Sequence, residues 1–323
     1  MHPALIRIRR ARRAGLTLVE VMVALVLLGI IAGGIMSVVM RQQRFYQSAT
    51  EVIDTRAQIR QAASVVPVDI RGISSVDGDI VQMTDSALEV RGNIGSAVLC
   101  SRAPLGANAI ITVTPMNLAD GRAFTAFLAR PKVNDLALVF NDSLGGTQDD
   151  TWNTYTITAI DSTVVGCAQF TDPTKDAGKY RYTYTLSGPT GSLTALPNMI
   201  VDGAPVRFVR RVRYALYQSP TDRKWWLGYR ECRGNGTSCD AVQPVSGPYR
   251  PYVSNDTLNS GLSFVYRDST GAVTNVATNV ARVDLFVNGE TQAPVSLGGN
   301  KAASVYRDFQ RVSIAIRNHQ GGN

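Results

Sequence analysis

An uncharged run of twenty residues near the start of the chain limits what this protein can fold into more than any other feature. The run covers Val21–Met40 and reads VMVALVLLGIIAGGIMSVVM. A helix rises about 1.5 Å per residue, so this run is about 30 Å long, the thickness of a bilayer's hydrocarbon core. The sequence therefore predicts one membrane-spanning helix, with most of the 323-residue chain following it.

The charges that flank this run predict its orientation. Residues 1–15 contain five arginines and no acidic residue, whereas only Arg41 and Arg44 follow the run closely. The positive-inside rule therefore keeps the N-terminus in the cytoplasm and places everything after Met40 outside. Removing the five arginines from the net charge of +8 leaves +3 for the rest, so the charge gives little support to a nucleic-acid partner.

The segment that joins the leader to the apolar run resembles a processing motif. Gly15–Glu20, GLTLVE, is similar to the cleavage and methylation motif of type IV prepilins and type II secretion pseudopilins. The resemblance implies a prepilin leader over 1–15, cleavage between Gly15 and Leu16 by the prepilin peptidase, and N-methylation of Leu16. The family usually has Phe at this position, so Leu16 is a conservative departure. The alternatives are an ordinary signal peptide cut near residues 32–34 and an uncleaved anchor.

Glu20 and three glycines are the candidate assembly residues of the apolar helix. A carboxylate in a membrane helix is costly unless it is paired. The resemblance implies that Glu20 pairs with the free amine of a neighbouring Leu16 during assembly, and a carboxylate that reaches water at the interface is the alternative. Gly29, Gly33 and Gly34 form either a close helix-packing face or a point where the helix softens, and tolerated membrane glycines are the other interpretation.

The helix is predicted to continue beyond the membrane. Residues 41–66 contain no Gly or Pro, and their apolar side chains recur as an amphipathic stripe until Pro67 ends the helix. The sequence thus predicts a transmembrane half over 16–40, an amphipathic half over 41–66, and an extracytoplasmic β-rich domain over 67–323. The fold class is α+β, with a long N-terminal helix packed on a mainly antiparallel β-sheet domain.

The C-terminal domain consists of short strand-like runs separated by turn residues. The predicted strands are Ile80–Arg91, Ala97–Cys100, Ile110–Thr114, Ala123–Ala129, Leu136–Phe140, Trp152–Ile160, Lys179–Leu186, Val206–Tyr217, Lys224–Glu231, Leu262–Arg267, Val280–Val287 and Arg311–Arg317. The least regular stretches are Asn141–Asp150 and Gly234–Pro251. Gly261–Val287 is a predicted hairpin that resembles the late hairpin of large minor pilins (PilW-type) and pseudopilin J-like proteins.

Four cysteines outside the cytoplasm indicate disulfides. Cys232 and Cys239 bracket a short glycine-containing loop and are paired first, which leaves Cys100 with Cys167. Free thiols are the alternative interpretation. The sequence predicts no zinc site, because it has no CxxC motif and its two histidines lie at opposite ends of the chain.

Two further patterns offer binding surfaces. Tyr180, Tyr182 and Tyr184 alternate, so they share one strand face, either as core packing or as an exposed surface. Most arginines of Val206–Tyr217 share the face opposite its apolar residues, which predicts a solvated strand face and, as the alternative, an anion site.

The sequence gives little indication of catalysis or of a cofactor. Asp142, Asp149 and Asp150 lie in a glycine-rich loop and are a weak calcium candidate, with a solvated turn as the favoured interpretation. The chain contains no nucleophile elbow, phosphate-binding loop or metalloprotease motif. We therefore expect a protein that is not an enzyme and that needs no cofactor.

The combined prediction is a minor pilin or pseudopilin, a structural subunit that is cleaved, N-methylated and added to a filament at its initiation or tip. The alternatives are a tip binding module, such as an adhesin or DNA-uptake subunit, and a type II secretion subunit that contacts secreted substrate. The expected partners are other pilins or pseudopilins, the prepilin peptidase and the inner-membrane assembly platform. The expected location is the bacterial inner membrane, with the C-terminal domain in the periplasm, and then the filament.

Overall fold

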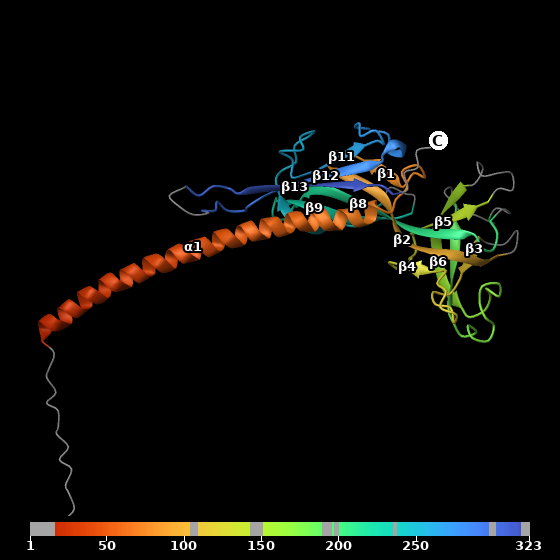
Figure 1. The fold of residues 1–323 in the computed structure, drawn as a ribbon, viewed down its shortest axis with the longest axis horizontal. Coiled ribbons are helices and arrows are strands. Elements are labelled where there is room, and N and C mark those ends of the chain that lie inside the picture. The colour runs from red at the N-terminus through yellow and green to blue at the C-terminus, as the bar shows by residue number, and fades with distance from the viewer. Residues whose placement is uncertain are drawn as a thin grey trace, which may run out of the picture.

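The computed structural model describes residues 17–103, 109–142, 151–188, 196, 200–234, 238–296 and 302–317. A single long helix, α1 (Leu18–Ile70), precedes a domain built almost entirely of β-strands. The N-terminal half of α1 projects away from this domain, and its C-terminal half lies against the strands (Figure 1). The predicted α+β fold class is confirmed.

The strands form one large antiparallel sheet and one small one. The large sheet contains β1 (Ile80–Met83), β2 (Ala87–Arg102), β3 (Ile110–Val113), β4 (Ala126–Phe127), β5 (Leu136–Asn141), β6 (Thr151–Thr163), β7 (Arg181–Ser187), β8 (Pro205–Gln218), β9 (Trp225–Cys232) and β10 (Gln243–Tyr249). The small sheet contains β11 (Leu262–Arg267), β12 (Arg282–Glu290) and β13 (Arg307–Ala315), with the 3₁₀ turn η1 (Ala277–Asn279) between β11 and β12.

The long strands β2 and β8 connect two lobes. They pair with each other over Ala87–Val98 and Pro205–Ala215. On the far side the pairing continues from β2 through β3, β7, β6 and β5 and returns to β8, which closes a ring of strands. Side chains from every strand of this ring fill one core, which includes Ile157, Tyr184 and Phe208. We call this part, which lies farthest from the start of α1 in Figure 1, the distal lobe.

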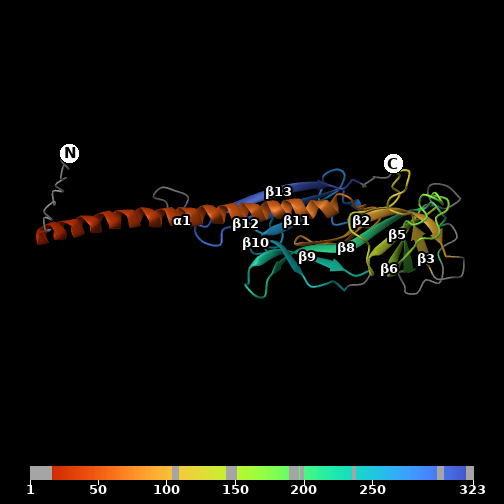
Figure 2. The same cartoon turned by 90° about the horizontal axis from the view of Figure 1, so that it is seen from below.

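The second lobe, the helix lobe, is built around α1. It contains β1, β9, β10, the adjoining halves of β2 and β8, and the small sheet. Ile59, Ala62, Val66 and Ile70 recur at helical spacing and are buried in its core with residues of both sheets. Figure 2 shows α1 running beside the small sheet, and α1 contacts β10, β12 and β13.

The prediction that Pro67 ends the helix is wrong. Pro67 lies inside α1, which continues to Ile70, and the Arg71 amide donates to the Pro67 carbonyl over 3.1 Å. An internal proline costs about 3 kcal/mol, because it removes one backbone hydrogen bond and crowds the preceding turn. Val66 and Ile70 are completely buried on either side of Pro67, so packing against the sheets holds the last turn in the helical form.

Two strand predictions also need correction. β10 lies within Gly234–Pro251, which the sequence analysis lists among the least regular stretches. Its prolines, Pro244 and Pro248, are unfavourable inside a sheet. β10 is an edge strand of the large sheet, where a missing amide costs no ladder hydrogen bond. The sequence analysis predicts two strands here, which end at Arg91 and resume at Ala97. β2 instead runs unbroken from Ala87 to Arg102, and its register against β8 shifts by a bulge between Asn93 and Gly95. The predicted hairpin of Gly261–Val287 is confirmed as the β11–β12 pair.

Candidate functional site

The exposed half of α1 is the feature of the molecule that most needs a partner. Every residue from Leu18 to Gln47 is exposed, including large apolar side chains such as Ile30, which is 67% exposed. Among the described residues, α1 is the one helix that is long and apolar enough to cross a membrane. So much contiguous apolar surface is not stable in water. The apolar half of α1 therefore fits a membrane anchor.

Thr17 and Glu20 form a capping box at the start of α1. The Glu20 amide donates to Thr17 Oγ1 over 3.3 Å, and the Thr17 amide donates to Glu20 Oε2 over 2.9 Å. The Thr17 hydroxyl donates to the same carboxylate oxygen over 3.1 Å. The carboxylate of Glu20 thus satisfies the free amide of Thr17 at its own helix terminus.

The sequence analysis missed this cap, although Thr-x-x-Glu before an apolar run is its signature. The sequence analysis considered only two partners for the Glu20 carboxylate, the amine of a neighbouring chain and water. In the single chain the carboxylate instead accepts hydrogen bonds from Thr17. Gly15 and Leu16, the predicted cleavage pair, lie outside the described residues.

The three glycines of the apolar half leave open space along the helix. Gly29, Gly33 and Gly34 all lie within the continuous helix α1. A Cβ atom placed on any of them would meet no other atom within 4 Å. This surface is accessible to a second helix, and the softening interpretation stays a prediction.

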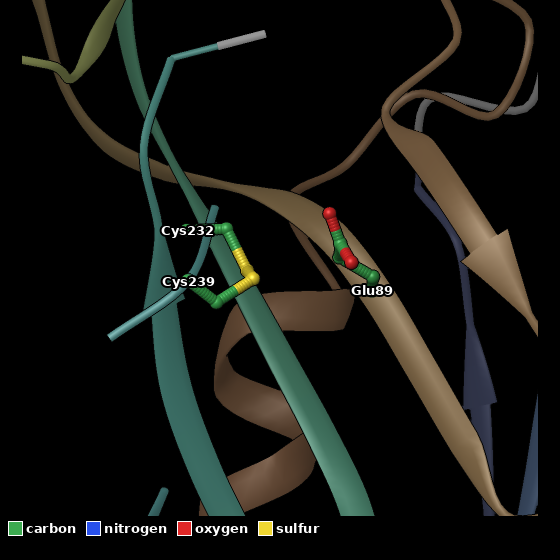
Figure 3. Close-up of side chains that lie close together, drawn as sticks. All are labelled: Glu89, Cys232 and Cys239. Carbon is green, nitrogen blue, oxygen red and sulfur yellow. A yellow bond between two sulfur atoms is a disulfide. The ribbon is translucent and has the colours of Figure 1, made fainter. Parts of the chain in front are cut away.

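The four cysteines form the two disulfides that the sequence analysis favours, Cys100–Cys167 and Cys232–Cys239. The second lies beside Glu89, and Figure 3 shows the carboxylate next to the bonded sulfur atoms. One ligand-type atom from each of these three residues lies within 4.8 Å of the others. Neither sulfur is a thiolate, however, and the Glu89 carboxylate is paired with Arg211, so these groups do not offer a metal centre in this state.

The prediction of a solvated arginine face on β8 is wrong. Arg207 donates to Asp79 over 3.1 Å, and Arg211 pairs with Glu89. The side chains of Arg207 and Arg211 are only 16% and 7% exposed. Asp79 directly precedes β1, and Glu89 lies on β2, the strand that pairs with β8. These arginines therefore form internal ion pairs and do not offer an open anion site.

The tyrosines of β7 serve mainly as core. Tyr184 is 1% exposed inside the distal lobe, where burial raises the pKa of its hydroxyl, and Tyr182 packs against the same core. Tyr180 precedes β7 and is 66% exposed. The packing interpretation is confirmed for Tyr182 and Tyr184, which leaves no tyrosine stripe on the surface.

The calcium candidate is only partly within the described residues. Asp142 follows β5 directly and is exposed. Asp149 and Asp150 lie outside the described residues, so the three carboxylates cannot be placed relative to one another. The calcium hypothesis stays a weak prediction from sequence.

Comparison with known proteins identifies only the N-terminal segment. Residues 10–36 match the family model of the prokaryotic N-terminal methylation motif. No curated protein and no solved structure matches the chain. The matched residues include the capping box and most of the exposed apolar half of α1. This motif supports a type IV pilin-like or pseudopilin protein.

Proposed function

We propose that this chain is a minor subunit of a type IV pilus-like filament or of a type II secretion pseudopilus. The observation that carries the proposal is the overlap of the methylation motif, residues 10–36, with α1, which begins at Leu18. The part of the motif that lies on α1 belongs to the helix half that projects from the domain without any covering. The apolar surface of such a helix contacts lipid before assembly and packs against neighbouring helices afterwards. A structural role, without catalysis, is sufficient to account for it.

In this proposal, processing and assembly are coupled through Glu20. Cleavage between Gly15 and Leu16 creates a new amine two residues before the first residue of α1. In a bundle of such helices, a carboxylate that leaves its own capping box needs a cation to offset its desolvation. The Leu16 amine of a neighbouring subunit supplies that cation only after the leader has been removed.

The size of the β domain supports a minor role. Two lobes with separate cores follow α1, and such a bulky domain would crowd every repeat of a thin fibre. A place at the tip or at filament initiation accommodates it better. The partners in this proposal are other pilins or pseudopilins, the prepilin peptidase and the assembly platform, at the bacterial inner membrane with the domain in the periplasm.

The alternative of a tip binding module has less support. The two binding surfaces suggested by the sequence, the arginines of β8 and the tyrosines of β7, are used mainly in internal ion pairs and packing. We therefore favour a structural subunit over an adhesin or DNA-uptake subunit.

The test is the intact mass of the membrane-extracted protein, produced with and without prepilin peptidase. We expect a chain that starts at N-methylated Leu16 only when the peptidase is present. The control Gly15→Val places a branched side chain at the cleavage point and should keep the leader even with the peptidase. A chain that always starts at Met1, or one that starts near Ile35, would contradict the proposal.

A further inference from the structure

Strand β13 forms an open edge of the small sheet. Among the described strands it pairs with β12 alone, over all nine of its residues and without a bulge. Its sequence contains no proline. Natural sheets usually protect an open edge with prolines, bulges or very short strands, because an unpaired edge is a template for another strand. β13 uses none of these three devices.

The pairing with β12 determines which backbone groups of β13 face outward. The Thr291 amide donates to the Tyr306 carbonyl over 3.0 Å, so this residue pair is a hydrogen-bonded one. Hydrogen-bonded and open pairs alternate along antiparallel strands, so the residues at every second position after Tyr306 bond to β12. The residues between them direct their N–H and C=O groups to the open edge: Arg307, Phe309, Arg311, Ser313 and Ala315.

A groove of about 270 Å³ separates this edge from α1. Three residues of α1 and three of β13 line it: Arg56, Ile59, Arg60, Asp308, Phe309 and Gln310. Arg56 Nε lies 2.9 Å from Asp308 Oδ2, whereas the Arg60 side chain makes no ion pair or hydrogen bond with any residue that the structure describes. Phe309 is 70% exposed. A strand added to β13 would therefore place the side chains of one face beside Arg60.

The arginines of β13 extend over their own sheet and leave the edge uncovered. Arg311 donates to Asp284 over 2.8 Å, and its guanidinium group lies 5.3 Å from the centre of the Phe286 ring. Arg307 Nε lies 3.4 Å from a carboxylate oxygen of Glu290. Asp284, Phe286 and Glu290 all belong to β12, so both guanidinium groups point away from the open edge.

The charges argue against a second copy of this chain as the occupant of the edge. If two β13 strands paired antiparallel about Phe309, Arg307 of each would face Arg311 of the other. Pairing about Arg311 would place the two Arg311 side chains opposite each other. Like charges directly opposite destabilise a strand pair, whereas opposite charges stabilise it. Arg307 and Arg311 on one face, and Arg60 beside the other, therefore favour a strand that carries Asp or Glu.

We propose that β13 binds an extended, acidic segment of another protein, which adds to the three-stranded small sheet as a further strand. Backbone hydrogen bonds to the outward groups of β13 supply the affinity, and the arginines select the acidic sequence. The Phe309 amide, which donates to Asp308 Oδ1 over 2.9 Å in the free protein, donates to the added strand instead. This inference concerns the folded β domain and does not depend on leader cleavage or filament assembly.

The test uses the detergent-solubilised full chain and a blocked, fluorescently labelled peptide of eight residues that alternates glutamate with valine. Fluorescence anisotropy should show saturable binding, and the same peptide with lysine in place of glutamate should bind much more weakly. Hydrogen exchange with residue resolution should slow by about tenfold at the Arg311 amide, while the amides of Gln310 and Val312, already bonded to β12, change little. No binding at about 1 mM peptide, equal binding of the lysine peptide, or binding that leaves the Arg311 amide unprotected would overturn the proposal.

Two substitutions of Phe309 separate the backbone edge from the side chain. Phe309→Pro removes an outward N–H that β12 does not use, and its ring obstructs an added strand. Phe309→Ala keeps the N–H. We expect Phe309→Pro to abolish peptide binding and Phe309→Ala to retain most of it, with slow exchange at Gln310 and Val312 showing that β13 is still paired. Equal losses in both variants would mean that the aromatic ring binds the peptide, and would overturn strand addition.

A second pair of variants tests the charge selection without altering β13. Arg60→Gln should weaken binding of the glutamate peptide about threefold, the size of an exposed ion pair. Arg130→Gln is the matched control, because it removes an exposed arginine of the distal lobe. Equal effects of the two variants would mean general attraction between opposite charges and would contradict the assignment. Sedimentation of the protein without peptide should show a monomer, and a dimer that Phe309→Pro abolishes would make a second copy the occupant and overturn the proposal.

Discussion

Asp284 lies at the centre of the small sheet with no exposed surface and with several donors around it. Ser313 Oγ donates to it over 2.6 Å, and Arg267 and Arg311 each donate over 2.8 Å. Burial alone raises the pKa of this carboxyl, but the hydrogen bonds from Ser313, Arg267 and Arg311 together outweigh burial. The pKa of Asp284 therefore lies below its ordinary value.

We expect Asp284→Asn to lower the free energy of unfolding by about 3 kcal/mol at neutral pH, because it leaves its arginine partners without their anion. The folded-state pKa is lower than the unfolded value of about 3.9, so the stabilisation is fully present above that pH and is lost as the pH falls through the folded-state value. Urea unfolding at several pH values should show the gap between wild type and variant narrowing below about pH 4. A gap of constant size would contradict this account.

The arginines of β8 show what can and cannot be predicted at the scale of single residues. Alternation along the strand predicts correctly which side chains share a face. It cannot predict which acidic residues pair with the arginines, because Asp79 is 128 residues from Arg207 and Glu89 is 122 residues from Arg211. Local spacing contains no information on such distant partners. The capping box of Glu20 could be predicted, because its partner is only three residues away.

At the scale of elements, the docking of α1 on the small sheet depends on Gly289 of β12. A Cβ atom at this position would lie 2.9 Å from Ile59 Cδ1 and 3.0 Å from Thr55 Cγ2, so the missing side chain lets the helix approach closely. We expect Gly289→Val to lower the free energy of unfolding by about 2 kcal/mol through overpacking. Gly178→Val is the control, because its Cβ would meet nothing within 4 Å. Similar losses of stability in both variants in urea unfolding would argue against this close approach.

The elements themselves are predictable to different degrees for physical reasons. The apolar half of α1 is predictable because its length and composition alone require lipid or protein around it. The position of β10 and the last residue of α1 are not predictable from local sequence. In both places a proline is tolerated only because of its tertiary surroundings. Pro67 is tolerated by the burial of Ile70, and Pro244 by the edge position of β10. The closed ring of the distal lobe depends on non-local pairings that no local pattern determines.

At the scale of the whole molecule, the two lobes have separate cores and are joined by the shared strands β2 and β8. The ion pair of Lys132 with Glu231 also links them. Each lobe contains one disulfide that has a cysteine on one of the strands of that lobe. Cys100–Cys167 links residues 67 apart and starts from β2 in the distal lobe, whereas Cys232–Cys239 links residues only 7 apart at the end of β9. The three tryptophans of the chain report on both lobes, because Trp152 lies on β6 and Trp225 and Trp226 begin β9.

We expect the loss of Cys100–Cys167 to uncouple the lobes. In the loop-entropy description, removing a link across 67 residues costs about 4 kcal/mol and removing one across 7 residues costs about 2 kcal/mol. In the Cys100→Ser, Cys167→Ser variant, Trp152 fluorescence should therefore change at a lower urea concentration than the fluorescence of Trp225 and Trp226. The Cys232→Ser, Cys239→Ser variant is the matched control and should show a smaller loss. If all three tryptophans respond at one urea concentration in the first variant, the lobes unfold as one cooperative unit, and β2 and β8 carry more of the stability than the separate cores imply.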